Sequence, residues 1–535
     1  MKKTIRIENL PSVVVSNYGS LNEAIFSASR PFTILFIKPY QPSVRMAHGP
    51  AIGILTLISV LKEKFGDCVR PIFRDMKLYG EAPEKVSALI DAHQPDAIAV
   101  SALNIEASAS YKIARICKQH QPYMLTILGG PISLRQTADI FSASDFDWIF
   151  EGAADRTLPV ALARHFGGIP LGNDIPGFSY RNERRDITYN NKQDLITDLD
   201  SIPMPSWEFH DFETSRKRDK LRIITNLDER PYAYLFTSRG CPYLCNYCHD
   251  IFTKRFIYQS NQRVIQEIAL LHDQHGVTEF HFVDDIFNLH RPRAQEIMSN
   301  IAERWGNNLY IAFPNGLRGD ILDQSTIDAM VKAGTYNATI SIETVTPRLQ
   351  ALVEKNLDIE KAKWSIEEFD RKGVVVHGSF MFGFPTEKIE EIKNTLNYAI
   401  KSPLLHAHFF AVVPHPGTPI FHMAMQESPE ATTIITASES GESDYNADIS
   451  WYQLAYGYPL RRLLFVGMLR FYFHPPRIVK FLRIYGKKAF TGFFMLIFNI
   501  AIERFYSLTK KFRIAIKDFK KPPTAPSPPP SSLAP

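Results

Sequence analysis

The sequence predicts an α/β protein with an N-terminal doubly wound parallel sheet, a partial (βα)6 barrel and a helical, basic C-terminal region. Two runs of short apolar segments alternate with segments of helical periodicity, and a polar, proline-containing stretch separates the two runs. Of the 535 residues, 45% are hydrophobic, which is enough apolar material for several cores. A single small module and a wholly disordered chain are therefore excluded.

Changes in composition along the chain divide it into six predicted segments. These are an N-terminal extension over 1–29, a doubly wound domain over 30–185, a linker over 186–230, a barrel over 231–425, a helical region over 426–519 and a disordered, proline-rich tail over 520–535.

The first domain contains five short segments that predict strands. They cover 32–38, 69–75, 96–103, 123–128 and 147–151, and helical patterns such as 51–65 and 107–119 lie between them. Regular alternation of strand and helix is typical of a doubly wound parallel sheet. Because no GxGxxG opens the first helix, a nicotinamide or flavin dinucleotide is disfavoured.

A second alternation of strands and helices predicts the barrel. Its expected strands are 233–239, 279–284, 309–314, 336–342, 374–382 and 406–413, with helices such as 261–275 and 387–400 between them. In barrels of parallel strands the chemistry lies at the C-terminal ends of the strands, so we expect the functional residues there.

Three of the five cysteines occupy one short loop with the spacing CxxxCxxC, after the first barrel strand. They are Cys241, Cys245 and Cys248. Structural zinc takes four ligands, and His249 directly follows Cys248, where it is poorly placed to complete a tetrahedron. A [4Fe–4S] cluster held by three thiolates keeps one iron open for another ligand. A zinc knuckle is the alternative interpretation.

This triplet resembles the signature of the radical S-adenosylmethionine (SAM) superfamily. The resemblance implies a [4Fe–4S] cluster whose open iron binds SAM, and an external electron donor of the flavodoxin or ferredoxin type. An electron from the reduced cluster would then cleave SAM to a 5′-deoxyadenosyl radical. Tyr247, just before the last cysteine, would lie near the adenine.

Four further predicted cofactor-binding residues lie at or near strand ends, where the same resemblance places SAM contacts. They are Asp285, Arg318, Glu343 and Gly383. The Glu343 carboxylate would accept hydrogen bonds from the ribose hydroxyls or the SAM amino group. A salt bridge at the barrel rim is the alternative role for Glu343.

The first domain resembles the cobalamin-binding domain of class B radical SAM enzymes. The resemblance implies that Ser101 bonds the dimethylbenzimidazole tail and that Gly129 and Gly130 let the backbone approach the ligand. Glu151, after the fifth strand, completes the predicted cobalamin contacts. A sheet of the same fold that binds no cobalamin is the alternative.

The usual cobalamin fingerprint DxHxxG is missing. The loop after the first strand contains His48 without an aspartate two residues before it, and Asp75-Met-Lys77 has lysine where the fingerprint has histidine. Protonated lysine is not a metal ligand. We therefore expect no protein side chain to coordinate cobalt from below.

The domain order resembles the group that contains the anaerobic magnesium-protoporphyrin cyclases and hopanoid methylases. It implies a cobalamin-dependent radical SAM enzyme that methylates an unactivated carbon of a hydrophobic small molecule. The alternatives are oxidative cyclisation or another radical reaction without methyl transfer, a non-catalytic cobalamin or redox sensor, and methylthio transfer to RNA or protein. No catalytic acid or base is identified.

The C-terminal region is strongly basic. Residues 461–521 contain fifteen Lys or Arg and two acidic residues, and 489–502 is an apolar run too short to span a bilayer. We expect a peripheral contact with the inner face of the membrane, or packing of this run on the barrel. The low, odd cysteine count favours the cytoplasm, and the core-like spacing of aromatic residues in the basic region disfavours a nucleic-acid partner.

Overall fold

The computed structural model describes residues 30–41, 49–134, 137–182, 184–190, 196–218, 230–248, 252, 254–439 and 450–486. Within this part of the chain, the residues up to Arg477 belong to one compact unit, and those from Ile478 onward to a second. The predictions made for 1–29, His48, 489–502 and 520–535 fall outside the described residues.

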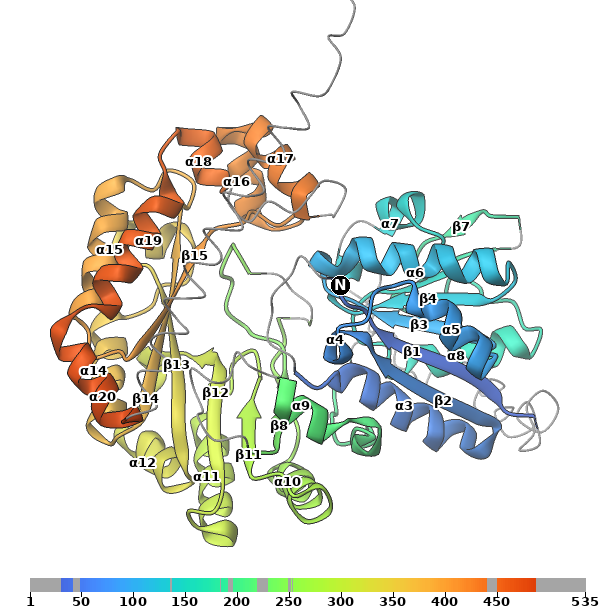
Figure 1. Cartoon of the computed structure of the whole chain (residues 1–535), viewed down its shortest axis with the longest axis horizontal. Coiled ribbons are helices and arrows are strands. Elements are labelled where there is room, and N and C mark those ends of the chain that lie inside the picture. The colour runs from blue at the N-terminus through green and yellow to red at the C-terminus, as the bar shows by residue number, and fades with distance from the viewer. Residues whose placement is uncertain are drawn as a thin grey trace, which may run out of the picture. The chain divides into compact units, whose positions relative to one another are not determined.

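The N-terminal domain is built on a seven-stranded sheet with the order β2-β1-β3-β4-β5-β6-β7 (Figure 1). The strands are β1 (Phe32–Lys38), β2 (Val69–Asp75), β3 (Ala97–Ser101), β4 (Leu125–Gly129), β5 (Trp148–Phe150), β6 (Phe178–Arg181) and β7 (Ile187–Thr188). Strands β1 to β5 are parallel and match the five predicted segments, whereas β6 and β7 continue the sheet in antiparallel pairing.

Helices cover both faces of this sheet, which confirms the doubly wound prediction. On one face, apolar side chains of α3 (Ile52–Phe65) and α8 (Thr157–Phe166) share a core with the strands. On the other face, the core includes α5 (Lys85–His93), α6 (Ala107–His120) and α7 (Thr137–Ala143). The short α4 (Met76–Tyr79) follows β2. Two-sided burial explains why the central strands are apolar throughout.

The second sheet has six parallel strands in the order β15-β14-β13-β12-β11-β8, so each strand pairs with its sequence neighbour. The strands are β8 (Tyr232–Leu235), β11 (Glu279–Phe282), β12 (Tyr310–Leu317), β13 (Thr335–Glu343), β14 (Val375–Phe382) and β15 (His406–Ala411). Within the described residues β8 and β15 do not pair with each other. The barrel is therefore open, as the prediction of a partial barrel requires.

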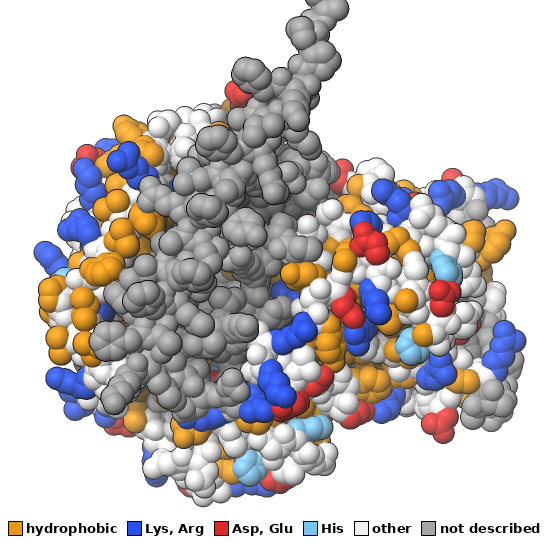
Figure 2. Space-filling view, in the orientation of Figure 1, with side chains coloured by type: hydrophobic (Ala, Val, Ile, Leu, Met, Phe, Trp, Pro, Cys, Tyr) orange, Lys and Arg blue, Asp and Glu red, His pale blue; other side chains and the backbone are white. Residues whose placement is uncertain are grey.

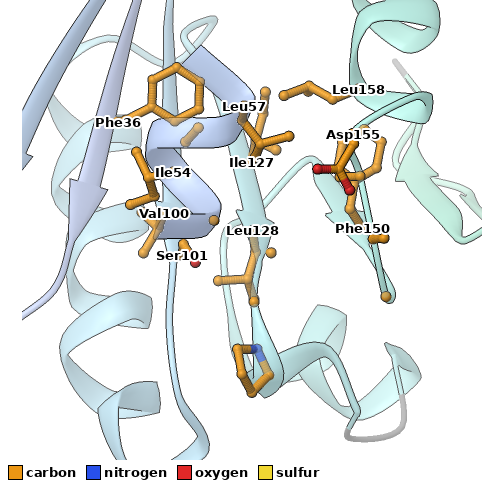
Figure 3. Close-up of a pocket in the computed structure, with 18 of the residues that line it drawn as sticks. Phe36, Ile54, Leu57, Val100, Ser101, Ile127, Leu128, Phe150, Asp155 and Leu158 are labelled. Carbon is orange, nitrogen blue, oxygen red and sulfur yellow. The ribbon is translucent and has the colours of Figure 1, made fainter. Parts of the chain in front are cut away.

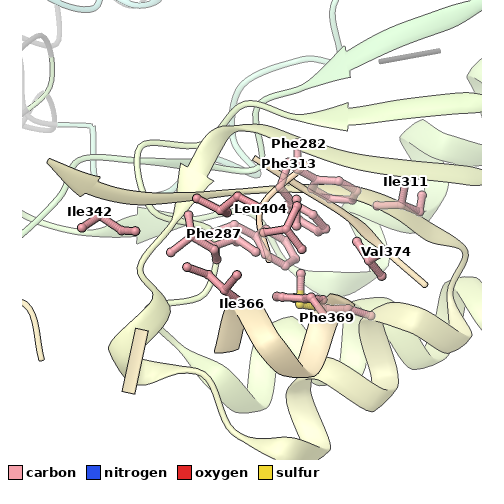
Figure 4. Close-up of a cluster of buried hydrophobic side chains, with 14 of the residues drawn as sticks. Phe282, Phe287, Ile311, Phe313, Ile342, Ile366, Phe369, Val374 and Leu404 are labelled. Atoms are coloured by element: carbon pink, nitrogen blue, oxygen red, sulfur yellow. The ribbon is translucent and has the colours of Figure 1, made fainter. Parts of the chain in front are cut away.

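The barrel core lies between the strands and an outer layer of helices (Figure 4). The helices are α10 (Asn261–His275), α11 (Arg291–Trp305), α12 (Gln324–Lys332), α13 (Pro347–Leu352), α14 (Ile359–Arg371) and α15 (Ile389–Lys401). Phe282 and Phe313 stack at 5.4 Å between ring centroids, and Phe369 of α14 belongs to the same cluster. Burying each large apolar side chain contributes about 2 to 3 kcal/mol.

The segment predicted as a linker is packed where the structure describes it. Trp207 is fully buried in the barrel core and donates its indole N–H to Glu267 of α10 at 3.1 Å. One residue earlier, the hydroxyl of Ser206 lies 2.8 Å from that of Ser59 on α3. The helix α9 (Phe212–Arg218) follows. This segment therefore fastens the first sheet to the barrel.

Five helices follow the barrel: α16 (Pro419–Glu427), α17 (Pro429–Glu439), α18 (Trp451–Tyr456), α19 (Leu460–Tyr472) and α20 (Pro475–Tyr485). Trp451 and Phe471 are fully buried in the barrel core. Arg477 donates to the carbonyls of Ser402 and Leu404 at 2.9 and 2.7 Å, next to the end of α15. Among the described helices, none combines the length and apolar character that a membrane crossing requires.

Candidate functional site

The cysteine loop begins where the first barrel strand ends. The short strands β9 (Ser238–Arg239) and β10 (Ile257–Tyr258) pair in an antiparallel manner and close the base of this loop. Gly240 turns the chain between β9 and the first cysteine with a φ of 84°, a conformation that favours glycine. All five cysteines are free thiols, and Cys248 is the most exposed of the three in the loop.

Three separate contacts fix the cysteine loop to the rim of the barrel. The backbone N–H of Gly240 donates to Asp285 at 3.0 Å. The guanidinium of Arg318 lies 3.8 Å from the ring centroid of Tyr243, which is a close cation–π contact. The side-chain amide of Asn246 donates to the carbonyl of Leu352 at 2.6 Å. Asp285 and Arg318, both predicted site residues, thus hold the loop, whereas the role of Asn246 was not predicted.

Asp284 supports the base of the loop from inside the barrel. It is 2% exposed and accepts hydrogen bonds from Thr237 at 3.0 Å and from Ser238 at 2.5 Å. Burial raises the pKa of the Asp284 carboxyl to about 6. Two adjacent aspartates, 284 and 285, therefore fix the chain on both sides of the turn into the cysteine loop.

The loop supplies three thiols, one fewer than a structural zinc ion takes, which fits a [4Fe–4S] cluster with one open iron. Among the described residues, no three His, Cys, Asp or Glu side chains are placed to hold a single metal ion. In a [4Fe–4S] cluster each thiolate binds a different iron, so the ligands surround the cluster without converging on one point. Burial raises the pKa of Cys241, with Cys245 and Asp285 adding to the effect, and iron would offset this by binding the thiolate.

Glu343, predicted to bind SAM, lies in a buried ion pair. Its carboxylate is 2.8 Å from the ammonium of Lys355, and both side chains are only 8% exposed. Burial, and then the nearby Glu343 carboxylate, hold the pKa of Tyr247 well above its usual range, so Tyr247 and Glu343 are neighbours. The lysine partner was not predicted. Its position in the loop after α13 depends on tertiary structure.

The backbone around this pair is held in an unusual conformation. Glu343, Glu354 and Asn356 have φ values of 65°, 54° and 48°, in the left-handed region that non-glycine residues rarely adopt. The Arg318 guanidinium donates to the carbonyls of Lys355 and Asn356 at 3.0 and 3.2 Å. Such conformations cost about 1 to 3 kcal/mol each and cluster at functional sites.

Gly383, a predicted cofactor contact, lies at the end of β14 in close contact with the helices that follow the barrel. Its φ is 87°, and an added Cβ would lie 2.8 Å from Tyr452 and 2.7 Å from Leu460. Its N–H donates to Glu387 at 2.5 Å. Glycine is therefore needed at 383 to pack the β14 end against α18 and α19, which is a structural role.

An apolar cavity of about 310 Å³ opens at the C-terminal edge of the N-terminal sheet (Figure 3). Phe36, Val100, Leu128 and Phe150, from the ends of β1, β3, β4 and β5, line it, together with Ser101. The strand order reverses at β1, and the crevice beside such a switch point is where open parallel sheets bind ligands. The size is near the lower end for small-molecule sites.

The two glycines that were predicted to contact cobalamin, Gly129 and Gly130, have different surroundings. A Cβ at Gly129 would meet no atom within 4 Å, so this backbone faces open space in the cavity. At Gly130 the φ is 86° and a Cβ would lie 2.8 Å from the Ser101 hydroxyl, so glycine there is needed for the turn. Glu151 is not among the lining residues and accepts a hydrogen bond from Thr137.

Lys77, which stands in place of the fingerprint histidine, is engaged elsewhere. Its ammonium lies 3.3 Å from Glu106, which also pairs with Lys38 at 2.6 Å. All three side chains are largely buried, with exposures of 11%, 2% and 16% in that order. Lys77 is therefore held in a buried ion-pair network.

Two residues that sequence reasoning did not pair, Asp155 and Arg239, complete the cavity. Their side chains meet in a two-pronged ion pair with N···O distances of 2.8 and 3.2 Å. Asp155 belongs to the loop after β5, whereas Arg239 stands two residues before Cys241. The cavity wall therefore continues directly into the cysteine loop.

Comparison with known proteins agrees with the cysteine motif. Residues 235–399 match the model of the radical SAM superfamily. An uncharacterized methyltransferase from Pyrococcus horikoshii is 26% identical, over 73% of this chain and 83% of that one. An anaerobic magnesium-protoporphyrin IX monomethyl ester cyclase from Rubrivivax gelatinosus is 24% identical, over 68% and 65%. The prediction of a radical SAM enzyme that uses a [4Fe–4S] cluster and SAM is confirmed.

A solved structure is similar to most of this chain. It is the radical SAM methyltransferase TsrM from Kitasatospora setae with cobalamin and a [4Fe–4S] cluster bound. The TM-score is 0.58 at 16% identity, and the match covers 74% of this chain and 75% of that one. This likeness confirms the predicted fold class.

The buried carboxyl of Glu387 gives a prediction about pH. Burial raises its pKa from the ordinary 4.5 to about 8, although the N–H groups of Gly383 and Phe384 donate to it. The folded protein thus binds this proton more tightly than the unfolded chain does. The resulting stability is fully present below pH 4.5 and is lost as the pH rises through about 8.

We expect Glu387→Gln, which cannot ionise, to reduce the loss of stability between pH 6 and pH 8 by at least about 1 kcal/mol. Denaturant unfolding at several pH values measures this. The matched control is Glu360→Gln on the surface of α14, which should leave the slope unchanged. Equal slopes for wild type and Glu387→Gln would contradict the prediction.

Proposed function

We propose that this radical SAM enzyme is cobalamin-dependent and methylates an unactivated carbon of a small molecule. The observation that carries the proposal is the apolar cavity at the edge of the N-terminal sheet, whose wall includes Arg239 at the start of the cysteine loop. A second cofactor bound in this cavity would adjoin the cluster loop. The relatives described as methyltransferases support the same reaction class.

The cavity suits part of a corrinoid better than the whole. At about 310 Å³ it is too small for the macrocycle, but its apolar lining suits an aromatic base such as dimethylbenzimidazole. Ser101 adds a hydroxyl to the lining, and a Cβ at Gly129 would meet no atom within 4 Å, which leaves room for a ligand beside the strand end. Bound cobalamin would supply a cobalt centre that carries the methyl group.

In the barrel, Cys241, Cys245 and Cys248 would hold the [4Fe–4S] cluster, which with SAM supplies radical chemistry when bound. Tyr247 presents a largely buried aromatic face beside Glu343, and the Glu343–Lys355 pair offers charged groups to the amino and carboxylate groups of SAM. Asp285, Arg318 and Asn246 hold the loop in place on the barrel rim. An external donor of the flavodoxin or ferredoxin type would provide the electron.

A radical oxidative cyclisation is the second candidate reaction, because a magnesium-protoporphyrin cyclase is similar to two thirds of the chain. Methylation adds the mass of one methylene unit to the substrate, whereas oxidative ring closure removes hydrogen. Mass change therefore separates the two reactions.

We expect Cys245→Ala to lose the brown cluster chromophore and to reduce 5′-deoxyadenosine formation at least about 100-fold, because the cluster has no spare thiolate. Anaerobic reconstitution, iron analysis and chromatography measure both. The matched control is Cys68→Ala, a thiol outside the loop, which should behave as wild type. A full iron content in Cys245→Ala would contradict the assignment.

A comparison of wild type with Cys245→Ala also tests the reaction. Extracts of cells that express wild type should contain a product heavier by one methylene unit, labelled when the methionine methyl group is labelled, and Cys245→Ala cells should lack it. A product that is lighter by hydrogen and unlabelled would favour oxidative cyclisation.

For the cobalamin site we expect Gly129→Leu to weaken hydroxocobalamin binding at least about 10-fold, because the side chain fills the open space over the strand end. Equilibrium dialysis with cobalt analysis measures the affinity. Gly129 is a cleaner test than Gly130, where any side chain also strains the turn. Ala143→Leu, on an exposed position of α7, is the control, and unchanged affinity in Gly129→Leu would refute the site.

We further propose a hydrophobic substrate and a peripheral position on the cytoplasmic face of the membrane. On α19, Arg462 and Arg470 are exposed, Val466 is 46% exposed, and Phe473 just beyond the helix is 47% exposed. Figure 2 shows apolar and basic side chains together along the edge where Figure 1 places α19. Residues 451–486 contain no Asp or Glu. This composition fits an anionic lipid surface.

We expect the protein to sediment with phosphatidylglycerol-containing vesicles at low salt and less at high salt, because salt screens the Arg and Lys charges. The double substitution Val466→Ser with Phe473→Ser should reduce binding several-fold. The control is Ile434→Ser on α17, a residue that is 42% exposed outside the basic region. A protein that stays in the supernatant at low salt would rule out this contact.

A further inference from the structure

The Asp155–Arg239 ion pair is unusual in its position. It joins the loop after β5 in the first sheet to β9 at the base of the cysteine loop, 84 residues apart in sequence. The side chains are 7% and 15% exposed, and both line the apolar cavity. In Figure 3 the Asp155 carboxylate stands among apolar side chains at the edge of this cavity.

Each residue of the pair belongs to a backbone segment beside one of the two proposed cofactor sites. Arg239 pairs with Ile257 through its backbone and precedes Gly240, whose N–H is held by Asp285 at 3.0 Å. Its guanidinium also lies 5.4 Å from the ring of Phe252. On the other side, Asp155 follows Gly152, whose positive φ of 77° shapes the loop over the cavity. The ion pair therefore links the loop after β5 to the strand that leads into the cysteine loop.

A buried ion pair contributes little net stability, because desolvation of both charges offsets their attraction. The pair instead fixes the relative orientation of the two loops, because a two-pronged Arg–carboxylate contact is geometrically specific. Energetic coupling between two sites requires an element whose arrangement both sites influence. This pair is the contact through which such an influence can pass, because it borders the cavity and the cysteine loop at once.

We propose that Asp155 and Arg239 are positioning residues that couple the two cofactor sites, so that loading the cysteine loop with its cluster tightens corrinoid binding in the cavity, and the reverse. The inference rests on the proposed function, since it requires both cofactors. By linkage, the two effects are equal in size. The enzyme would thereby hold its corrinoid firmly only when the cluster is in place.

The test measures hydroxocobalamin affinity of the full chain by equilibrium dialysis, with and without the cluster reconstituted from ferrous iron and sulfide. Wild type should bind at least about 5-fold more tightly when the cluster is present. In Asp155→Asn, in Arg239→Gln and in the double variant the ratio should fall below about 2. A residue with a merely structural role would change affinity in both states alike and leave this ratio unaltered.

The matched control is Asp174→Asn, which breaks the two-pronged Arg164–Asp174 pair of the same domain, away from the cavity. Its ratio should equal that of wild type. As a reciprocal readout, hydroxocobalamin should slow the removal of iron by a chelator in wild type and not in the Asp155 and Arg239 variants.

The outcomes distinguish a failure of the proposed function from a failure of the coupling alone. If wild type binds no hydroxocobalamin, the proposed function fails and this inference with it. If wild type binds both cofactors with a ratio near one, or if the variants keep the wild-type ratio, only the coupling is refuted. Recovery of the ratio in the charge-exchanged variant Asp155→Arg with Arg239→Asp would strengthen the assignment to the pair itself.

Discussion

Parallel pairing of strands is the constraint on which the rest of this structure depends. In both sheets the parallel strands end at one common edge, so the loops that follow them gather there even though they are far apart in sequence. The cavity follows β1, β3, β4 and β5, and the cysteine loop follows the first barrel strand. Each site is thus assembled from short loops on rigid strands, which is a stable way to hold reactive cofactors in fixed positions.

The cysteine loop shows how such a site is held without regular secondary structure of its own. Three contacts hold it. Asp285 accepts a hydrogen bond from the loop backbone, Arg318 makes a cation–π contact with the loop, and the side-chain amide of Asn246 donates from the loop to the barrel. Glu343, Glu354 and Asn356 have left-handed backbone conformations, so this arrangement includes local backbone strain. The residues that hold the loop differ from those of the apolar core, which lies between the strands and the outer helices.

Most of the fold could be predicted from the sequence, because apolar periodicity reflects burial directly. All eleven predicted strands have counterparts within a few residues, and the helix predicted over 261–275 is α10. Tertiary partners could not be predicted in this way. Lys355, Asp155 and Asn246 carry no local signal, and Trp207 lies in a proline-containing stretch that was interpreted as a linker. Gly383 has a positive φ, and Tyr452 packs so closely against it that no Cβ would fit, which the sequence alone does not reveal.

The sequential strand order of the barrel has a consequence for how the chain is made. Each barrel strand pairs with the one synthesised just before it, so the sheet can grow strand by strand as the polypeptide leaves the ribosome. Among the described residues, Trp451, Phe471 and Arg477 join the barrel late in the sequence: Trp451 and Phe471 belong to the barrel core, and Arg477 contacts the chain just after α15. Until those residues emerge, a nearly complete barrel exposes that apolar surface to solvent, and a chain truncated before α18 should be more prone to aggregation than the full chain.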